Sequence, residues 1–309
     1  MSLLFIAPGR DLSGIESALQ KLDPNIDIDI WPAVSSKERV RMAVCWNHPA
    51  HVLSEFPNLV LASSLGAGVN HLLNDGSLDE DIALSRVVTN DLKDQMTEYA
   101  LMSVLAYRRK FARYVEQKRE AHWSVSSPVP MSDSVIGVMG LGEMGMTIAR
   151  SFAKLGYRVN GWNRSGKNTS DVQVYTGKDQ LKSFLENSNI IICTLPLTVE
   201  TEGILNLDLF KQIRKPGYFI NMGRGSHLVE EDLIYALDVR ELEGACLDVF
   251  EKEPLSPDHI FWNRPNIMIT PHIAALTDDE EAASVILENY KRCLSGMDPL
   301  FKVDRKKGY

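Results

Sequence analysis

Three segments of the sequence place polar side chains directly after apolar runs, where a strand could hold a functional group. Arg224 stands between two glycines in "INMGRGSHLVE", and Asp248 and Glu253 follow the apolar start of "CLDVFEKEPL". His272 follows Pro271 in "MITPHIAAL", between an apolar run and small residues. Ligands of open α/β sheets bind beyond the carboxyl ends of the strands, so all three segments are candidates for a site.

Each of these side chains allows a structural as well as a functional interpretation. A guanidinium between glycines can bind a carboxylate through two parallel hydrogen bonds, but Arg224 could equally be a surface arginine. Asp248 and Glu253 could orient a base or bind a carboxamide, or they could be solvated loop charges. His272 could be a proton donor, since histidine titrates near neutral pH, or only the end of a strand.

Other kinds of chemistry are disfavoured by spacing. The 7 histidines and 4 cysteines form no H-x-x-x-H, H-E-x-x-H or C-x-x-C pattern, which argues against a metal centre. No G-x-S-x-G segment accompanies His272, so a serine nucleophile is not indicated. Hydride transfer to a carbonyl needs one proton donor, and His272 is suited to that task.

The segment "VIGVMGLGEMGMTIARSF" predicts a dinucleotide-binding loop. An apolar strand runs into Gly140-Leu141-Gly142-Glu143-Met144-Gly145, with the spacing G-x-G-x-x-G, and a helix of good helix formers follows. The glycines allow a tight turn, the approach of a pyrophosphate and close packing of helix on strand. The N-terminus of the helix favours phosphate. The hexapeptide alone is weak evidence, and the strand–turn–helix–strand context makes it strong.

The end of the next strand, in "YRVNGWNRS", favours NADPH over NADH. An NAD site usually has Asp or Glu there, whereas this chain has Asn163-Arg164-Ser165. A carboxylate would repel the 2′-phosphate, whereas Arg164 can bind it, with Ser165 and Lys167 adding a hydroxyl and a charge. The alternative is a solvated turn with an incidental arginine, and NADH remains a possible cofactor.

Two α/β series surround these residues. The first has predicted strands at residues 3–8, 27–31, 42–46, 59–64 and 86–90, with helices at 13–22 and 36–42. A long helical stretch at 93–121 follows. The second series has predicted strands at 134–140, 157–162, 189–195, 217–222, 244–250 and 266–270, and a last helix at 278–295. Alternating strands and helices predict parallel sheets with helical crossovers.

The composition indicates a folded protein without a nucleic-acid or membrane partner. The 309 residues are 44% hydrophobic and 24% charged, and the net charge of -8 disfavours a nucleic-acid surface. No apolar run reaches the roughly 20 residues that cross a bilayer, and no secretory signal is evident. The scattered cysteines suit a reducing compartment, so we expect a cytoplasmic location.

Taken together, the segments resemble the D-isomer-specific 2-hydroxyacid dehydrogenase family. The phosphate loop, "CTLPLTVETEGIL", "INMGRG", "GACLDVFEKEPL" and "ITPHIAA" occur in the family's order and spacing, and "SLGAGVNHLL" matches its substrate-side glycine loop. "GWNRS" and "MAVCWNHP" look most like the glyoxylate/hydroxypyruvate reductase branch. Asn70 replaces an Asp of many members, and Met222-Gly223 replace small or hydroxyl residues, but neither departure removes a catalytic group.

The resemblance implies an α/β protein with two doubly wound parallel-sheet domains. A Rossmann-type cofactor domain would span residues 98–276, and a discontinuous flavodoxin-like substrate domain would comprise residues 1–97 and 277–309. The helix near 98–121 and the following loop resemble the family's dimerisation region, which implies a homodimer.

The resemblance also implies catalytic roles. Arg224 would bind the substrate carboxylate and polarise the carbonyl group. His272 would be the general acid during reduction, and Glu253 would hydrogen-bond it and favour its protonated form. Asp248 would meet the nicotinamide end of the cofactor.

Further contacts are carried over in the same way. The backbone N–H groups of Ala67 and Gly68 would hold the substrate carboxylate from the other domain, and Trp46 would line the pocket. The remaining implied cofactor contacts are Leu195, Pro196, Thr201, Met222, Gly223 and His272.

The implied activity is the NADPH-preferring reduction of small 2-oxo acids, glyoxylate and hydroxypyruvate, to 2-hydroxy acids. Two alternatives remain at this point: an NAD-dependent dehydrogenase for a bulkier acid, and a dinucleotide-sensing regulatory protein. Glu253 argues against the similar formate dehydrogenase branch, which pairs its histidine with glutamine.

Overall fold

The chain divides into two compact units. The computed structural model of the protein describes residues 1–164, 166 and 170–309. Unit 1 comprises Met1–Leu92 and Thr277–Tyr309, and unit 2 comprises Lys93–Leu276. The division at 92/93 falls within helix α3 (Asn90–Arg108), a few residues before the expected boundary at 97/98.

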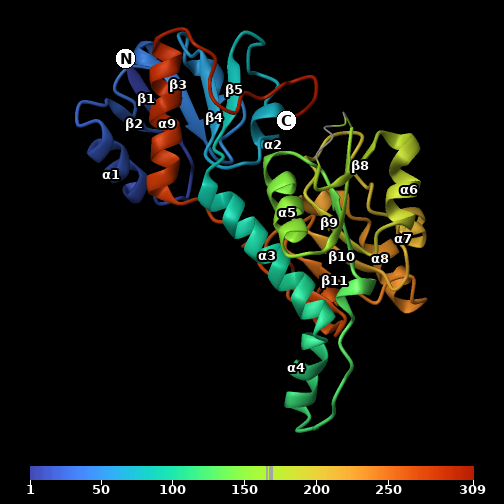
Figure 1. The fold of residues 1–309 in the computed structure, drawn as a ribbon. Helices are drawn as coiled ribbons and strands as arrows, with labels where there is room; N and C mark the ends of the chain where they lie inside the picture. Colours follow the sequence, from blue (N-terminus) through green and yellow to red (C-terminus); the bar gives the residue numbers. More distant parts are fainter. Residues whose placement is uncertain (165, 167–169) are drawn as a thin grey trace. The chain divides into compact units, whose positions relative to one another are not determined.

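Unit 1 is built on a parallel sheet with the strand order β2-β1-β3-β4-β5, which is the flavodoxin-like order (Figure 1). Its strands are β1 (Ser2–Ile6), β2 (Ile28–Ile30), β3 (Val40–Cys45), β4 (Leu61–Ser64) and β5 (Ala83–Arg86). Its helices are α1 (Ser13–Leu22), α2 (Asn70–Leu73) and α9 (Asp279–Leu294).

Both faces of the unit 1 sheet are covered. Side chains alternate along a strand, so Leu3 and Phe5 of β1 pack with α1 and α9, whereas Leu4 and Ile6 belong to the cluster on the opposite face. Although α9 comes from the end of the chain, it packs against α1 and β3 (Figure 1). The C-terminal segment is thus part of the core of this unit.

Two elements predicted for unit 1 are wrong. Residues 36–42 form no α-helix; a short 3-10 turn, η1 (Lys37–Arg39), leads directly into β3 at Val40. The helix-forming charged residues are outweighed by the pairing of β3 with β1 and β4, which sequence-local patterns do not reveal. Residues 86–90 form no strand, because β5 ends at Arg86 and Val87 and Val88 are buried in the connection to α3.

Unit 2 is built on a parallel sheet with the order β12-β11-β10-β9-β6-β7-β8. This is the Rossmann order with one additional strand, and the order reverses between β6 and β9. The strands are β6 (Val135–Met139), β7 (Arg158–Asn163), β8 (Gln173–Thr176), β9 (Ile190–Cys193), β10 (Tyr218–Asn221), β11 (Gly244–Leu247) and β12 (Ile267–Ile269). The predicted pair of doubly wound parallel sheets is therefore confirmed.

Helices cover both faces of this second sheet. On one face lie α3 and α5 (Glu143–Lys154), which share a buried cluster containing Tyr99, Ile136 and Phe152. On the other lie α6 (Leu181–Glu186), α7 (Leu207–Gln212) and α8 (Glu230–Asp238), which pack around Phe184, Phe210 and Phe219. The carboxyl ends of the strands are left for loops. In the described part of the chain, no helix is long and apolar enough to cross a membrane.

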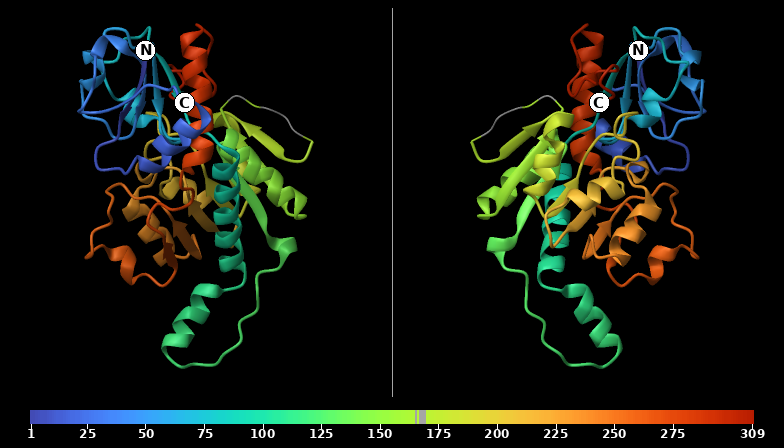
Figure 2. Two further views of the ribbon diagram at one scale, coloured as in Figure 1. Left: turned by 90° about the vertical axis from the view of Figure 1, so that its left-hand side faces the viewer. Right: turned by 90° about the vertical axis from the view of Figure 1, so that its right-hand side faces the viewer.

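An arm extends from the end of α3 in unit 2. The predicted helix at 93–121 is interrupted, since α3 ends at Arg108 and α4 (Phe111–Arg119) begins after Lys110, which adopts a left-handed φ of 56°. Residues 120–130 then return toward β6, so that α4 and this segment run away from the sheet of the unit (Figure 2). We call residues 109–130 the arm.

Candidate active site

The glycine loop after β6 has the geometry of a pyrophosphate-binding turn. Gly140 has a φ of 97°, and a Cβ at Gly145 would lie 1.8 Å from the Gly140 carbonyl oxygen, so neither position accepts a side chain. A Cβ at Gly142, the residue preceding α5, would meet no described atom within 4 Å. The loop therefore leaves open space at the N-terminus of a 12-residue helix, where a phosphate is favoured.

The non-glycine residues of this loop differ in what they can contribute. Leu141 is buried, and its side chain occupies the space beside Gly161, so only its backbone can reach a ligand. Glu143 forms an ion pair with Lys93 at 2.8 Å. Met144 is partly buried on the cluster beneath α5.

Two cations gather where β7 and β8 end. Asn163 and Thr176 are paired across these strands, and the Asn163 side chain accepts a hydrogen bond from the Gly166 N–H at 2.8 Å. The positive charges of Arg164 and Lys178 both contribute to lowering the pKa of Glu200, after the larger effect of hydrogen bonds from Thr198 and its own backbone. Lys178 was not predicted, because β8 was not recognised. Ser165 lies outside the described residues.

The loop after β9 is folded by its own hydroxyl groups. The Thr201 hydroxyl donates to the Pro196 carbonyl oxygen at 2.7 Å and accepts from the Thr198 N–H at 2.8 Å. Leu195 is buried, and Thr194 donates to the Gly140 carbonyl oxygen at 2.8 Å. This loop is therefore fixed against the glycine loop.

Arg224 lies in the loop after β10 and is held closely by its surroundings. Its Nη1 donates to the carbonyl oxygen of Gly223 at 2.6 Å, and the two preceding residues, Met222 and Gly223, are buried. Burial lowers the pKa of the guanidinium, and the nearby charge of Glu253 opposes that effect. A desolvated cation with spare donors is suited to an anionic ligand.

Glu253 and His272 form the central pair of the candidate site. The Nδ1 atom of His272 lies 2.7 Å from Glu253 Oε2, and Glu253 Oε1 accepts the Phe250 N–H at 3.0 Å. The side chains of His272 and Glu253 remain 43% and 37% exposed, so a ligand can reach the pair. With Nδ1 bound to the carboxylate, Nε2 is the atom left for proton transfer.

Asp248 organises the loop that carries His272. It is 1% exposed, and its carboxylate accepts hydrogen bonds from the Thr270 hydroxyl and from the N–H groups of Ile273 and Ala274, at 2.7, 2.8 and 2.8 Å. Its own carbonyl oxygen accepts the His272 N–H at 2.9 Å. These bonds hold His272 at a φ of 55°, a left-handed conformation that non-glycine residues rarely adopt.

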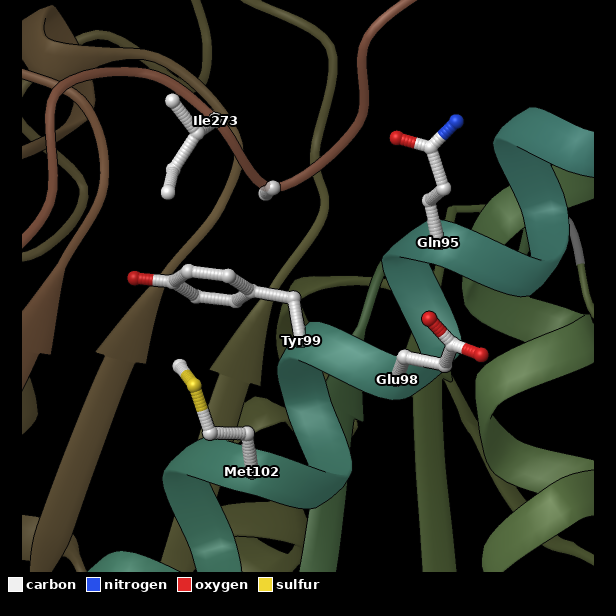
Figure 3. A pocket seen from close by; sticks show the side chains of 6 residues that line it. Gln95, Glu98, Tyr99, Met102 and Ile273 are labelled. Carbon is white, nitrogen blue, oxygen red and sulfur yellow. The ribbon is translucent and has the colours of Figure 1, made fainter.

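Helix α3 supports the same loop from behind. The Tyr99 hydroxyl hydrogen-bonds Thr270, and Gln95 binds both the N–H and the carbonyl oxygen of Leu276, at 2.8 and 2.9 Å. A shallow pocket of about 270 Å³ lies between this face of the helix and Ile273 (Figure 3). Neither Gln95 nor Tyr99 was predicted, since nothing in the local sequence of a helix reveals a contact so far along the chain.

Unit 1 presents a glycine loop of its own after β4. The Ser64 hydroxyl donates to the Gly68 carbonyl oxygen at 2.6 Å, and within the described residues neither the Ala67 nor the Gly68 N–H donates to a protein acceptor. Trp46 packs beside this loop, since a Cβ at Gly66 would lie 3.0 Å from its ring. These N–H groups are available to an anion.

The described residues contain no group of three or more His, Cys, Asp or Glu side chains that could hold a metal ion.

Comparison with known proteins identifies the class to which this fold and site belong. Residues 101–274 match the family profile described as D-isomer specific 2-hydroxyacid dehydrogenase, NAD binding domain. The chain therefore belongs to the D-isomer-specific 2-hydroxyacid dehydrogenase family, as the sequence predicted.

Two full-length relatives belong to the same branch of this family. The chain is similar to glyoxylate/hydroxypyruvate reductase A of Photorhabdus laumondii, 37% identical over 314 residues, and of Yersinia enterocolitica, 33% identical over 314 residues; both alignments cover 100% of each chain. The similarity extends to both units, including the discontinuous one.

Solved structures give the same result. A D-isomer specific 2-hydroxyacid dehydrogenase of Xanthobacter autotrophicus in complex with NADPH and MES has a TM-score of 0.95 and 33% identity, covering 100% of this chain and 99% of that chain. An NADPH-dependent glyoxylate/hydroxypyruvate reductase of Sinorhizobium meliloti in complex with NADP and sulfate has a TM-score of 0.92 and 33% identity, covering 100% of both chains.

Proposed function

We propose that this enzyme reduces small 2-oxo acids, glyoxylate and hydroxypyruvate, to 2-hydroxy acids, with NADPH as its preferred cofactor. The observation that carries the proposal is the His272–Glu253 pair beside a desolvated Arg224, in the same unit as a glycine loop open to a pyrophosphate. The names of the full-length relatives support the substrate class.

The side chains divide the work of the reaction. When bound, the dihydronicotinamide supplies a hydride to C2 of the acid. Arg224 binds the carboxylate and polarises the carbonyl, and His272 delivers the Nε2 proton to the carbonyl oxygen while Glu253 holds its Nδ1. The N–H groups of Ala67 and Gly68 and the ring of Trp46 are further proposed contacts of the acid.

Cofactor binding is assigned to the loops at the carboxyl edge of the unit 2 sheet. The glycine loop and α5 would hold the pyrophosphate, and Arg164 and Lys178 would bind the 2′-phosphate, where Asn163 replaces the carboxylate of an NAD site. Among the described residues, one carboxylate oxygen of Asp248, Oδ2, accepts only the Ala274 N–H, at 2.8 Å, and would meet the carboxamide. The loop containing Leu195, Pro196 and Thr201 would line the site together with Met222 and Gly223.

A substrate and cofactor panel tests the proposal directly. Purified enzyme would be assayed for loss of NADPH or NADH absorbance with glyoxylate, hydroxypyruvate and the bulkier phenylpyruvate. We expect the highest kcat/KM with the two small acids and with NADPH. If the absorbance of neither cofactor fell with any of the acids, the proposed activity would be contradicted. A clear preference for NADH would contradict the role of Arg164.

We further propose that the enzyme is a cytoplasmic homodimer that associates through its arm. The arm exposes apolar side chains, among them Phe111 at 59%, Trp123 at 97% and Val125 at 87%. Exposed apolar side chains gathered on one segment are typical of a protein–protein interface.

A further inference from the structure

His227 is a buried side chain that joins two loops of the proposed site. It ends the turn η5 (Gly225–His227), and none of its surface is exposed. Its Nδ1 accepts the backbone N–H of Arg224 at 3.0 Å, and its Nε2 lies 3.2 Å from the carbonyl oxygen of Pro196. An amide N–H can only donate and a carbonyl oxygen can only accept, so both bonds require the neutral ring with its hydrogen on Nε2.

The space around this ring is filled. A Cβ at Gly223 would lie 2.9 Å from His227 Nδ1 and 3.2 Å from the Leu195 carbonyl oxygen. On the other side of Arg224, the Asn221 amide donates to the Arg224 carbonyl oxygen at 3.1 Å and accepts the Gly223 N–H at 3.1 Å. The backbone of Arg224 is thus held by Asn221 through its carbonyl group and by His227 through its N–H group.

We propose that His227 is a positioning residue, which holds the Arg224 backbone at a fixed spacing from the Pro196 loop so that bound acid and bound cofactor are aligned. The inference rests on the proposed function, in which Arg224 binds the acid and the Pro196 loop contacts the cofactor. His227 touches neither ligand in this assignment and acts only through the two loops.

The chemistry of the ring agrees with this role. Burial lowers the pKa of His227 to about 4, so the ring is neutral at physiological pH, as its two hydrogen bonds require. A rigid link matters here because a misplacement of about 1 Å of a substrate-binding group can reduce the rate by on the order of 100-fold.

Two amide substitutions separate the bonds of the ring. The amide oxygen of Asn can take the place of Nδ1, and the amide nitrogen of Gln can take the place of Nε2. His227→Asn therefore keeps an acceptor for the Arg224 N–H and loses the bond to Pro196. His227→Gln keeps the bond to Pro196 and releases Arg224.

The two variants are expected to fail in different ways. His227→Gln should raise the KM for glyoxylate and lower kcat, so that kcat/KM falls about 10- to 100-fold. The Kd of NADPH should stay unchanged. For His227→Asn we expect kcat/KM for glyoxylate nearer to that of the unsubstituted enzyme, with a Kd of NADPH raised several-fold. Steady-state kinetics and fluorescence titration with NADPH measure these quantities, and urea unfolding shows that each variant is folded.

His259 provides a matched control. Its Nδ1 also accepts a backbone N–H, that of Phe261 at 3.3 Å, and its Nε2 lies 3.0 Å from Glu230. His259→Asn and His259→Gln should leave all these constants unchanged.

The outcomes distinguish a failure of the positioning role of His227 from a failure of the proposed reductase activity. A folded His227→Gln with unchanged kinetics, or two variants impaired equally in both constants, would overturn the positioning role while leaving the reductase activity intact. If one variant fails to fold, the other still decides through its own ratio of KM to Kd. An unsubstituted enzyme that reduces neither small acid would overturn the proposed function and this inference together.

Discussion

His272 occupies a strained backbone conformation that the surrounding residues maintain. A left-handed φ in a non-glycine residue costs on the order of 1–3 kcal/mol, and such strain tends to occur where function requires a particular orientation. The Asp248 carboxylate offsets this cost by accepting the N–H groups of the next two residues. Asp248 is therefore as much a structural support of His272 as a candidate ligand of the cofactor.

Removal of the imidazole tests the role of His272. His272→Ala should lower kcat with glyoxylate by about 100- to 10,000-fold, because general acid catalysis contributes an effect of that size. The Kd of NADPH should change little, since the glycine loop is untouched. Kinetics and fluorescence titration would check both, with His259→Ala as the control; turnover close to that of the unsubstituted enzyme would exclude His272 as the proton donor.

The neutral state of His227 also predicts a dependence of stability on pH. Its pKa falls from 6.5 to about 4 on folding, so the unfolded chain binds more protons between these values. The contribution is complete above pH 6.5, is lost as the pH falls to about 4, and amounts to at most about 3 kcal/mol. Urea unfolding of the enzyme and of His227→Gln across this range should give a flatter pH profile for the variant; parallel profiles would contradict the assignment.

At the residue scale, the sequence indicated the candidate catalytic side chains but not the residues that support them. Arg224, Glu253 and His272 stand in segments that resemble those of a family, so their types and spacing carried information. Tyr99 and His227 act through hydrogen bonds to residues distant in the sequence or to main-chain atoms. No periodicity or motif reports such contacts before the fold is known.

At the scale of elements, helix α3 packs on one face of the unit 2 sheet and supports the loop of His272. Gln95 and Tyr99 lie one turn apart on the helix and bind the loop at Leu276 and Thr270. The Tyr99 hydroxyl is also within hydrogen-bonding distance of Cys246, at 3.2 Å, and burial raises its pKa, so the phenol stays neutral. The helix therefore fixes both ends of the segment that carries the proposed acid.

A single hydroxyl group tests this link. Tyr99→Phe should reduce kcat with glyoxylate by roughly tenfold, because the loop of His272 loses a support, while the Kd of NADPH stays constant. Tyr107→Phe is the matched control, since its buried hydroxyl donates to Glu243 at 2.9 Å without contacting the loop. Both variants should lose about 1 kcal/mol of stability, and equal kcat values in the two would show that Tyr99 is only structural.

The elements themselves were predictable to different degrees. Buried central strands such as β6, β9 and β10 are short apolar runs, which the sequence shows plainly. The edge strand β8 was missed because its residues are only partly buried and include polar ones. Residues 36–42 were wrongly predicted as a helix because strong helix formers lie just before β3. This strand forms through its pairing with strands that are distant in the sequence.

At the scale of the whole molecule, the arm stands out because several large apolar side chains on it are exposed to solvent. Its helix and its return segment are joined by hydrogen bonds between the Tyr114 hydroxyl and the backbone of Ser126, at 3.0 and 3.2 Å. Its exposed apolar side chains, Phe111, Val115, Trp123 and Val125, are of the kind that an interface covers.

Acidic substitutions in the arm test the proposed dimer. Phe111→Asp together with Trp123→Asp should raise the dimer dissociation constant at least tenfold, because buried charges without partners destabilise an interface. Sedimentation velocity over a concentration series measures this constant. Val239→Asp, a similar change at the 46% exposed residue that follows α8, should have no effect; a dimer unaffected by the arm substitutions would place the interface elsewhere.

Because α9 belongs to unit 1 but follows unit 2 in the chain, the core of unit 1 is completed only after unit 2 has been synthesised. Residues 1–92 leave the ribosome before unit 2, yet the helix that covers Ile15 and Leu19 of their core is made only after unit 2. Unit 2 is continuous in the chain and can complete its sheet during translation, since domains generally fold as units. Residues 1–92, the larger part of unit 1, therefore keep an apolar face uncovered during the synthesis of unit 2, and transiently exposed apolar surface of this kind favours aggregation and chaperone binding.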